Sequence, residues 1–177
     1  MSNFHSLISN ANKLKLKNDY YSALKLYEQA LSLNKKNIDL MYEIGIIHRS
    51  LGDLKKARQF FFKIIKEEPA NTKSHRMLST LFDYKFEDEH LNIMLNLFNS
   101  KKLNDVELID LEFALGKAYE DKEDYELSFK HFKNANDKKY EMTGSNIENL
   151  EKHFSQILET FQKINFRMAP SKIIDNK

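Results

Sequence analysis

Cysteine is absent from this sequence of 177 residues, and glycine and proline are rare, with four and two residues. The absence of cysteine excludes disulfides, cysteine-ligated zinc sites and thiol nucleophiles. No stretch approaches the roughly 18 uninterrupted apolar residues that a membrane-spanning helix needs. The first residues also lack the continuous apolar segment of a secretory signal. We therefore expect a cytoplasmic protein with no membrane partner.

A strong charge of one sign is also lacking. Lysine and arginine together number 28, and aspartate and glutamate 26, so the net charge is +2 at pH 7. Only four of the basic residues are arginines, the side chain that nucleic-acid sites favour for bidentate contacts to phosphates and bases. The lysines are interspersed with acidic residues, a pattern that solubility explains. The composition predicts no nucleic-acid partner.

What the sequence does contain is apolar residues at helical spacing. Between positions 20 and 33 they recur at intervals of three and four, the pattern of an amphipathic α-helix: Tyr20, Ala23, Leu24, Tyr27, Ala30 and Leu31. Similar patterns follow along most of the chain, separated by short polar breaks such as Gly52-Asp53 and Pro69-Ala70-Asn71. This arrangement predicts an all-α chain of short helices joined by tight turns.

The helical segments repeat along the chain. Ala57-x3-Phe61 lies 34 residues after Ala23-x3-Tyr27, and Leu115-Gly116 lies two such repeats plus three residues after Ile44-Gly45. The turns keep the same phase, because an aspartate that can cap the following helix recurs at three of them: Asp19, Asp53 and Asp124. The chain therefore reads as a series of helical hairpins.

These residues resemble the tetratricopeptide repeat, whose first helix carries Leu-Gly-x2-Tyr and whose second carries Ala-x3-Phe, with a late proline. Leu115-Gly116-x2-Tyr119, Ala57-x3-Phe61 and Pro69 match these positions. The resemblance implies an α-solenoid of about four repeats. The third is degenerate, since Ser79 replaces the glycine and three residues are inserted. The expected units are residues 4–37, 38–71, 72–108 and 109–142.

A further helix is expected after the fourth unit. Ser145-x2-Glu148 has the form of a capping box, and a stripe of apolar residues runs from Ile147 to Ile164. Because the last repeat of a solenoid exposes an apolar face, a helix over residues 145–166 would serve as its cap. Residues 167–177 are expected to form a tail or linker.

The fourth unit and the expected cap also resemble a narrower family. The segments LEFALGKAYEDKEDYELSFKHFKNAN and NIENLEKHFSQILETF are similar to the helical region that precedes the sulfotransferase domain in bacterial tetratricopeptide-repeat sulfotransferases. The resemblance implies the N-terminal regulatory or substrate-presenting region of such an enzyme, or a stand-alone relative. None of the family's donor-binding or catalytic residues is assigned here, because no glycine-rich phosphate loop follows a strand.

One cluster has the residue types of a metal site. Glu87-Asp88-Glu89-His90 combines carboxylates with an imidazole, but neighbours on a helix point in different directions. We interpret the acidic residues as the first turn of a helix, where they complement the helix dipole. The six histidines form no HExxH motif, and no serine lies in a GxSxG motif. We predict no metal, no cofactor and no catalytic residue.

The concave groove of a tetratricopeptide array is the remaining candidate site. In such arrays the first helix of each repeat lines a surface that takes extended or helical peptide segments. By repeat phase, the side chains that face it here are Asn12, Tyr42, Arg49, Lys73, Arg76, Thr80, Phe113 and Lys117. A mixture of aromatic residues and hydrogen-bond donors predicts a peptide-binding surface. A clamp for a C-terminal carboxylate is not expected, because Glu43 stands where that clamp has a donor.

The sequence therefore predicts a non-catalytic module that binds a protein or peptide in the groove of the solenoid. Two alternatives stay open. One is the sulfotransferase-associated role, with docking to a catalytic domain. The other is self-association, in which the groove or the cap packs against a second copy of the chain.

Gly116 interrupts a strong helix pattern, although glycine in a helix interior costs about 1 kcal/mol relative to alanine. Gly45 has the same repeat phase. We therefore expect both glycines to lie where the two helices of a hairpin approach closely, and we expect Gly116→Leu to destabilise the fold.

Overall fold

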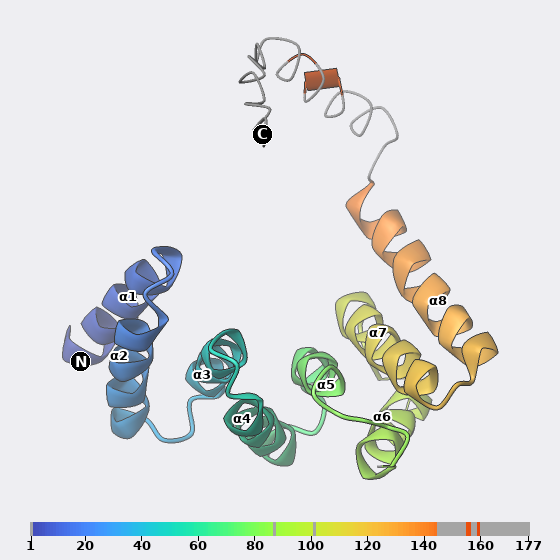
Figure 1. Ribbon diagram of the computed structural model, residues 1–177, viewed down its shortest axis with the longest axis horizontal. Helices are drawn as coiled ribbons and strands as arrows, with labels where there is room; N and C mark the ends of the chain where they lie inside the picture. The colour runs from blue at the N-terminus through green and yellow to red at the C-terminus, as the bar shows by residue number, and fades with distance from the viewer. Residues whose placement is uncertain (1, 87, 101, 145–154, 157–158, 160–177) are drawn as a thin grey trace, which may run out of the picture. The chain divides into compact units, whose positions relative to one another are not determined.

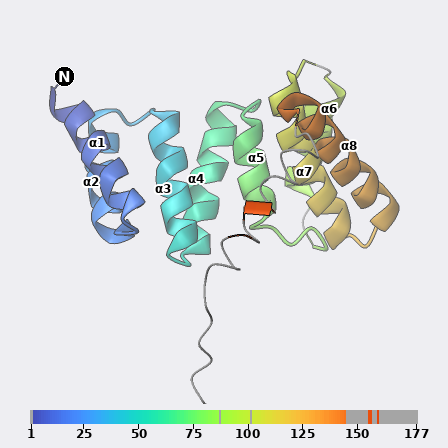
Figure 2. The same cartoon turned by 90° about the horizontal axis from the view of Figure 1, so that it is seen from above.

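The computed structural model describes residues 2–86, 88–100, 102–144, 155–156 and 159. Within these residues the chain forms eight α-helices and no β-strand, which confirms the all-α fold (Figure 1). The helices are α1 (Ser2–Leu16), α2 (Tyr20–Leu33), α3 (Ile38–Ser50), α4 (Leu54–Glu67), α5 (Thr72–Ser79), α6 (Glu89–Asn99), α7 (Asp105–Asp121) and α8 (Tyr125–Thr143). Two consecutive pairs, α1 with α2 and α3 with α4, pack as helix-turn-helix hairpins, as Figure 2 shows, whereas α5 has its main contact with α7.

The chain divides into two compact units, Met1–Lys139 and Tyr140–Lys177. The first unit holds α1 to α7 and most of α8, and the contacts below all lie within it. The expected cap at 145–166 and tail at 167–177 lie almost entirely outside the described residues. No helix that the structure describes is long and apolar enough to cross a membrane.

Three of the hairpin turns share one backbone design. The last residue of each turn has a positive φ, of 60°, 80° and 62° at Asn18, Gly52 and Glu123. The aspartate that follows donates its N–H to a carbonyl five residues earlier, as in a Schellman motif. Its side chain accepts from the backbone N–H three residues on, at Asp19, Asp53 and Asp124. The predicted helix caps are confirmed at these three positions.

The third hairpin departs from this design. α5 ends at Ser79 and α6 begins at Glu89, so residues 80–88 replace the tight turn. Phe82 and Tyr84 from this segment are buried in the core. The connection is long because α5 has 8 residues where α3 has 13, and the two buried rings make it contribute to the core.

Both helix-interior glycines face an aromatic ring of the second helix. A Cβ at Gly45 would lie 3.0 Å from Cε1 and Cζ of Phe61, and one at Gly116 would lie 2.7 Å from Cδ1 of Phe132. The close approach expected from the sequence is confirmed. The group that needs the space is a ring, and the backbone of the facing helix is not among the nearest atoms.

The second and fourth hairpins also share a pair of stacked rings, which lies one helical turn after these two glycines. His48 is buried and stacks on Phe60, with ring centroids 5.8 Å apart and planes 18° apart. At the equivalent positions of the fourth hairpin, Tyr119 stacks on His131 at 5.4 Å and 2°. The histidine is on the first helix of the second hairpin and on the second helix of the fourth hairpin, so both hairpins have a histidine stacked on an aromatic ring. His48 therefore has the packing role that its repeat position predicts.

The core consists of two clusters of buried side chains. The first joins the first two hairpins and includes Ala11, Tyr27, Leu40, Ile44 and Ile47. The second continues from α3 to α7 and includes Met41, Phe61, Leu78, Tyr84, Met94, Leu111 and Leu115. Because α3 contributes to both clusters, the first unit is packed continuously from α1 to α7. This packing holds the first helices of the hairpins in register.

Candidate partner-binding surface

The eight residues predicted to line the groove come from α1, α3, α5 and α7, and we call the face they form the inner surface. On α3, Tyr42 and Arg49 are seven residues apart. Lys73 and Arg76 on α5 and Thr80, the residue directly after this helix, are separated by three and four. Such spacings place side chains on one side of a helix. Asn12, Arg49, Lys73 and Thr80 are exposed, and Tyr42, Arg76, Phe113 and Lys117 are half-buried. All eight are thus at least partly open to solvent.

The centre of the inner surface consists of two cations stacked on two aromatic rings. Lys73 Nζ lies 4.9 Å from the centroid of the Tyr42 ring, and Arg76 Cζ lies 4.3 Å from the centroid of the Phe113 ring. Both distances are within the range of cation–π attraction. Since Lys73 and Arg76 are on α5, the pairs join α5 to α3 on one side and to α7 on the other. The structure therefore brings four of the predicted residues together.

Carboxylates lie among these cations. Arg76 Nη1 is 2.9 Å from Oδ1 of Asp110, and Lys73 Nζ is 3.8 Å from Oδ1 of Asp39. The Asp110 side chain is only 17% exposed, so its pair with Arg76 is the better shielded of the two. The inner surface accordingly presents both signs of charge and would not attract a polyanion.

Tyr42 stands in the middle of these charges. Burial raises the pKa of its hydroxyl, and the nearby carboxylates of Asp110 and Glu43 raise it further, against the opposing influence of Arg76 and Arg49. The phenol is therefore held protonated and available as a hydrogen-bond donor. Sequence reasoning did not include Asp110 in the surface, although Asp110 is three residues before Phe113 and shares its helical phase.

The remaining predicted residues of α3, α5 and α7 are engaged more locally. Arg49 Nη1 is 3.9 Å from Sδ of Met77, a weak contact, and Arg49 stays exposed. Thr80 Oγ1 donates to the carbonyl of Met77 at 2.8 Å. Lys117 pairs with Asp121 one turn further along α7. Of these three, Arg49 keeps the most open polar group for a partner.

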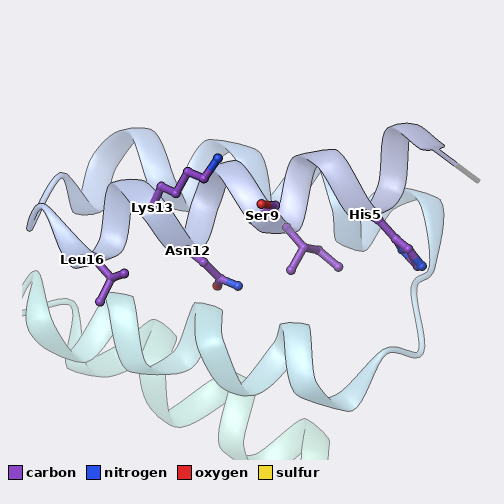
Figure 3. A pocket seen from close by; sticks show the side chains of 6 residues that line it. His5, Ser9, Asn12, Lys13 and Leu16 are labelled. Carbon is purple, nitrogen blue, oxygen red and sulfur yellow. The ribbon is translucent and has the colours of Figure 1, made fainter.

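Asn12 belongs to a hollow on the α1 side of the inner surface. Figure 3 shows side chains of this helix that line a space of about 370 Å³: His5, Ile8, Ser9, Asn12, Lys13 and Leu16. The Asn12 carbonyl oxygen accepts from the hydroxyl of Tyr27, which orients the amide. Lys15 and Glu43 form an ion pair at 2.5 Å that ties α1 to α3. Its lining combines the apolar side chains of Ile8 and Leu16 with amide, hydroxyl and ammonium groups.

The described residues of the acidic cluster in front of α6 are not grouped as a metal site. Asp88 is the residue before the helix, Glu89 lies in its first turn, and Asp88 pairs with Lys122 at 2.5 Å. The His90 side chain is fully buried and hydrogen-bonded to His75. Among the residues that the structure describes, no three histidine or acidic side chains are grouped so that they could hold a metal ion. The helix-start interpretation of this cluster agrees with the structure.

Comparison with known proteins supports the repeat assignment. Residues 16–81 match the tetratricopeptide repeat family, the stretch that contains α2 to α5 and two of the turns described above. Together with the paired helices, this match shows that residues 16–81 carry tetratricopeptide repeats, as the sequence predicts for this stretch. Among curated proteins, the comparison finds no significant match. The similarity to sulfotransferase-associated repeats has no counterpart among these findings.

Solved structures similar to the chain include several of MamA. MamA from Desulfovibrio magneticus RS-1 is 16% identical, with 93% of this chain and 98% of that chain covered and a TM-score of 0.61. A structure titled MamA AMB-1 is also 16% identical, with 81% of this chain and 75% of that chain covered and a TM-score of 0.54. At such identities the likeness establishes a shared fold of stacked helical hairpins and does not establish a shared partner.

Proposed function

We propose that the chain is a non-catalytic binding module that takes an extended or helical peptide segment of a protein partner along its inner surface. The observation that supports this function is the continuous row from Tyr42 through Lys73 and Arg76 to Phe113, which crosses three helices. Tetratricopeptide repeats in general serve protein–protein interaction. No cofactor enters the proposal, and a cytoplasmic location stays a prediction of the sequence.

The chemistry of the row suits a peptide. Aromatic and arginine side chains are the residues that most often dominate binding energy at protein interfaces. The Tyr42 hydroxyl and the Arg49 guanidinium can donate to main-chain carbonyls, and the carboxylates of Asp39 and Glu43 can accept from main-chain N–H groups. A partner segment with both donors and acceptors therefore fits better than a polyanion such as RNA.

The test begins with selection of binding peptides from a random displayed library against the purified full chain. The dissociation constant of the tightest peptide is then measured for wild type, for Arg49→Ala and for Lys73→Ala. Each substitution is expected to weaken binding about 5-fold or more, since a contributing interface residue is worth roughly 1 kcal/mol. Lys55→Ala, at an exposed position on α4, is the matched control and should bind as wild type.

Two results would contradict the proposal. One is a library that yields no peptide binding below millimolar concentration. The other is a peptide whose affinity is unchanged by both inner-surface substitutions. A chain that forms dimers at micromolar concentration, with Arg49→Ala or Lys73→Ala dissociating them, would instead favour the self-association alternative.

The sulfotransferase-associated role stays a hypothesis that rests on the resemblance of the fourth unit and the expected cap alone. No contact of the described residues favours it over peptide binding. A supporting result would be binding of the chain, through α7 and α8, to an isolated sulfotransferase domain.

A further inference from the structure

Three buried polar side chains of the third hairpin form a hydrogen-bonded chain that the inner surface does not use. His75 on α5, His90 on α6 and Tyr84 between them have no solvent-exposed surface (0%). His75 Nδ1 is 2.9 Å from His90 Nε2, and His90 Nδ1 is 2.5 Å from the Tyr84 hydroxyl. At the other end, His75 Nε2 is 2.9 Å from the carbonyl oxygen of Pro69. This chain connects α5 directly with α6.

The carbonyl of Pro69 determines where every hydrogen in the chain lies. A carbonyl oxygen only accepts, so His75 Nε2 carries a hydrogen and its Nδ1 is bare in the neutral ring. His90 Nε2 must therefore donate to His75 Nδ1, which leaves His90 Nδ1 to accept from Tyr84. Both imidazoles are thus neutral and protonated at Nε2.

An added proton disturbs this arrangement. A proton on His90 Nδ1 would reverse the hydrogen bond with the Tyr84 hydroxyl, and a proton on His75 Nδ1 would face the Nε2–H of His90, so that both downstream hydrogen bonds would have to reverse direction. A second proton would leave hydrogens on both facing nitrogens, and no acceptor between them. The cost is high because a buried charge without a partner is strongly disfavoured.

The surroundings add to this cost. The rings of Phe82 and Phe62 lie 5.0 and 6.4 Å from the ring of His90. The charged group that faces the pair from α4 is the guanidinium of Arg58, 3.9 Å from the Phe82 centroid. Burial lowers the pKa of His75, although its bond to Pro69 acts in the opposite direction. Burial, followed by His75 and Arg58, lowers the pKa of His90 to about 3.

We propose that the Pro69–His75–His90–Tyr84 chain is an acid-sensitive latch, which holds α5 on α6 near neutral pH and releases the third hairpin in mild acid. Because α5 also carries Lys73 and Arg76, release would separate these cations from Tyr42 and Phe113. The expected loss of partner binding in acid rests on the proposed function, whereas the expected opening of the hairpin is independent of it.

The direction and size of the effect follow from proton linkage. A histidine whose pKa is lowered in the closed state binds its proton only after the hairpin opens. Such a histidine therefore stabilises the closed state at a pH above its ordinary pKa of about 6.5. This stabilisation is lost as the pH falls below about 6.5. Between pH 6 and pH 5, His90 alone, whose pKa in the closed state lies far below this range, raises the opening constant about 8-fold, and the lowered pKa of His75 acts in the same direction.

Amide hydrogen exchange of the full chain measures this opening without any partner. For wild type, the protection factors of α5 and α6 amides, corrected for intrinsic exchange, should fall by about 8-fold or more from pH 6 to pH 5. His90→Gln keeps an amide donor for His75 and removes the group with the lower pKa, so its fall should be about 8-fold smaller than that of wild type. His5→Gln, at an exposed position on α1, is the control and should match wild type. An equal fall in wild type and His90→Gln would overturn the latch.

Nitrogen NMR of the wild-type imidazoles tests the same proposal and does not depend on whether the variant folds. Two of the six histidines should remain neutral and protonated at Nε2 at pH 5, as long as the hairpin is closed. If His75 and His90 titrate near 6.5, or show the opposite tautomer, the latch is refuted. Peptide binding that weakens in acid without hairpin opening would also refute it, while leaving the proposed function intact.

Discussion

Substitution of Gly116 tests whether ring packing, and not a special backbone conformation, explains a glycine in the middle of α7. A Cβ at this position would lie 2.7 Å from Cδ1, 2.8 Å from Cε1 and 3.0 Å from Cγ of Phe132. The contact includes the base of the ring, which cannot move away by a small rotation. Phe132 also packs against Phe113, with centroids 6.3 Å apart, so displacement of its ring would reach the inner surface.

The magnitude is a balance of two terms. Alanine at Gly116 gains about 1 kcal/mol of helix propensity, and overpacking costs about 1–3 kcal/mol. We therefore expect Gly116→Ala to lower the free energy of unfolding by about 1 kcal/mol, and Gly116→Leu to lower it by about 3 kcal/mol because more atoms need room. Gly45→Ala should cost less, since its Cβ would meet only the far edge of Phe61 at 3.0 Å.

Urea denaturation followed by circular dichroism provides the measurement, with the slope of the transition as a check that unfolding stays cooperative. Phe132→Leu removes the clashing ring, so the double variant Gly116→Ala with Phe132→Leu should lose less stability than the sum of the two single variants. If Gly116→Ala instead stabilises the protein by about 1 kcal/mol, as in an open helix position, the packing explanation is refuted.

Three further predictions concern single contacts. Glu112→Leu removes the buried carboxylate that lies 2.5 Å from His131 Nδ1, and a loss of about 3 kcal/mol in urea is expected. Asn104→Ala removes the capping box that this residue forms with Glu107 at the start of α7, and it should cost about 1 kcal/mol by the same assay. Burial, followed by the negative charge of Glu43, raises the pKa of the Tyr27 hydroxyl to about 12. The unfolded chain therefore loses this proton at a lower pH than the folded chain. The stabilisation that the protonated hydroxyl provides below about pH 10 is lost as the pH rises toward 12. Thermal unfolding of Tyr27→Phe should show a smaller alkaline loss than wild type, and an identical loss would contradict the assignment.

The repeat architecture was predictable because its determinants are local. The aspartate caps act over three residues, and the helical stripes and glycines recur at nearly constant spacing, so each could be recognised without knowledge of distant contacts. The degenerate third unit was also recognisable, since Ser79 and the three inserted residues break the repeat. The burial of Phe82 and Tyr84 could not be predicted, because it depends on side chains from other hairpins.

The helix face on which the candidate residues lie was predictable from the repeat phase, but the contacts between these residues were not. Lys73 and Arg76 were expected on one face of a helix, yet their stacking on Tyr42 and Phe113 depends on how neighbouring hairpins pack. The same limit explains why the latch was missed. His75 and His90 are in different helices, and the acidic residues that precede His90 made it resemble a surface histidine, whereas the structure buries its side chain completely.

The most direct test of the central proposal is amide NMR of the full chain during titration with a library-selected peptide. If the inner surface binds the partner, the largest shift changes should fall on α1, α3, α5 and α7, with residues near Tyr42, Lys73, Arg76 and Phe113 most affected. α2 and α4 should change little. Shift changes concentrated on α2 and α4, with the inner surface unaffected, would contradict the account.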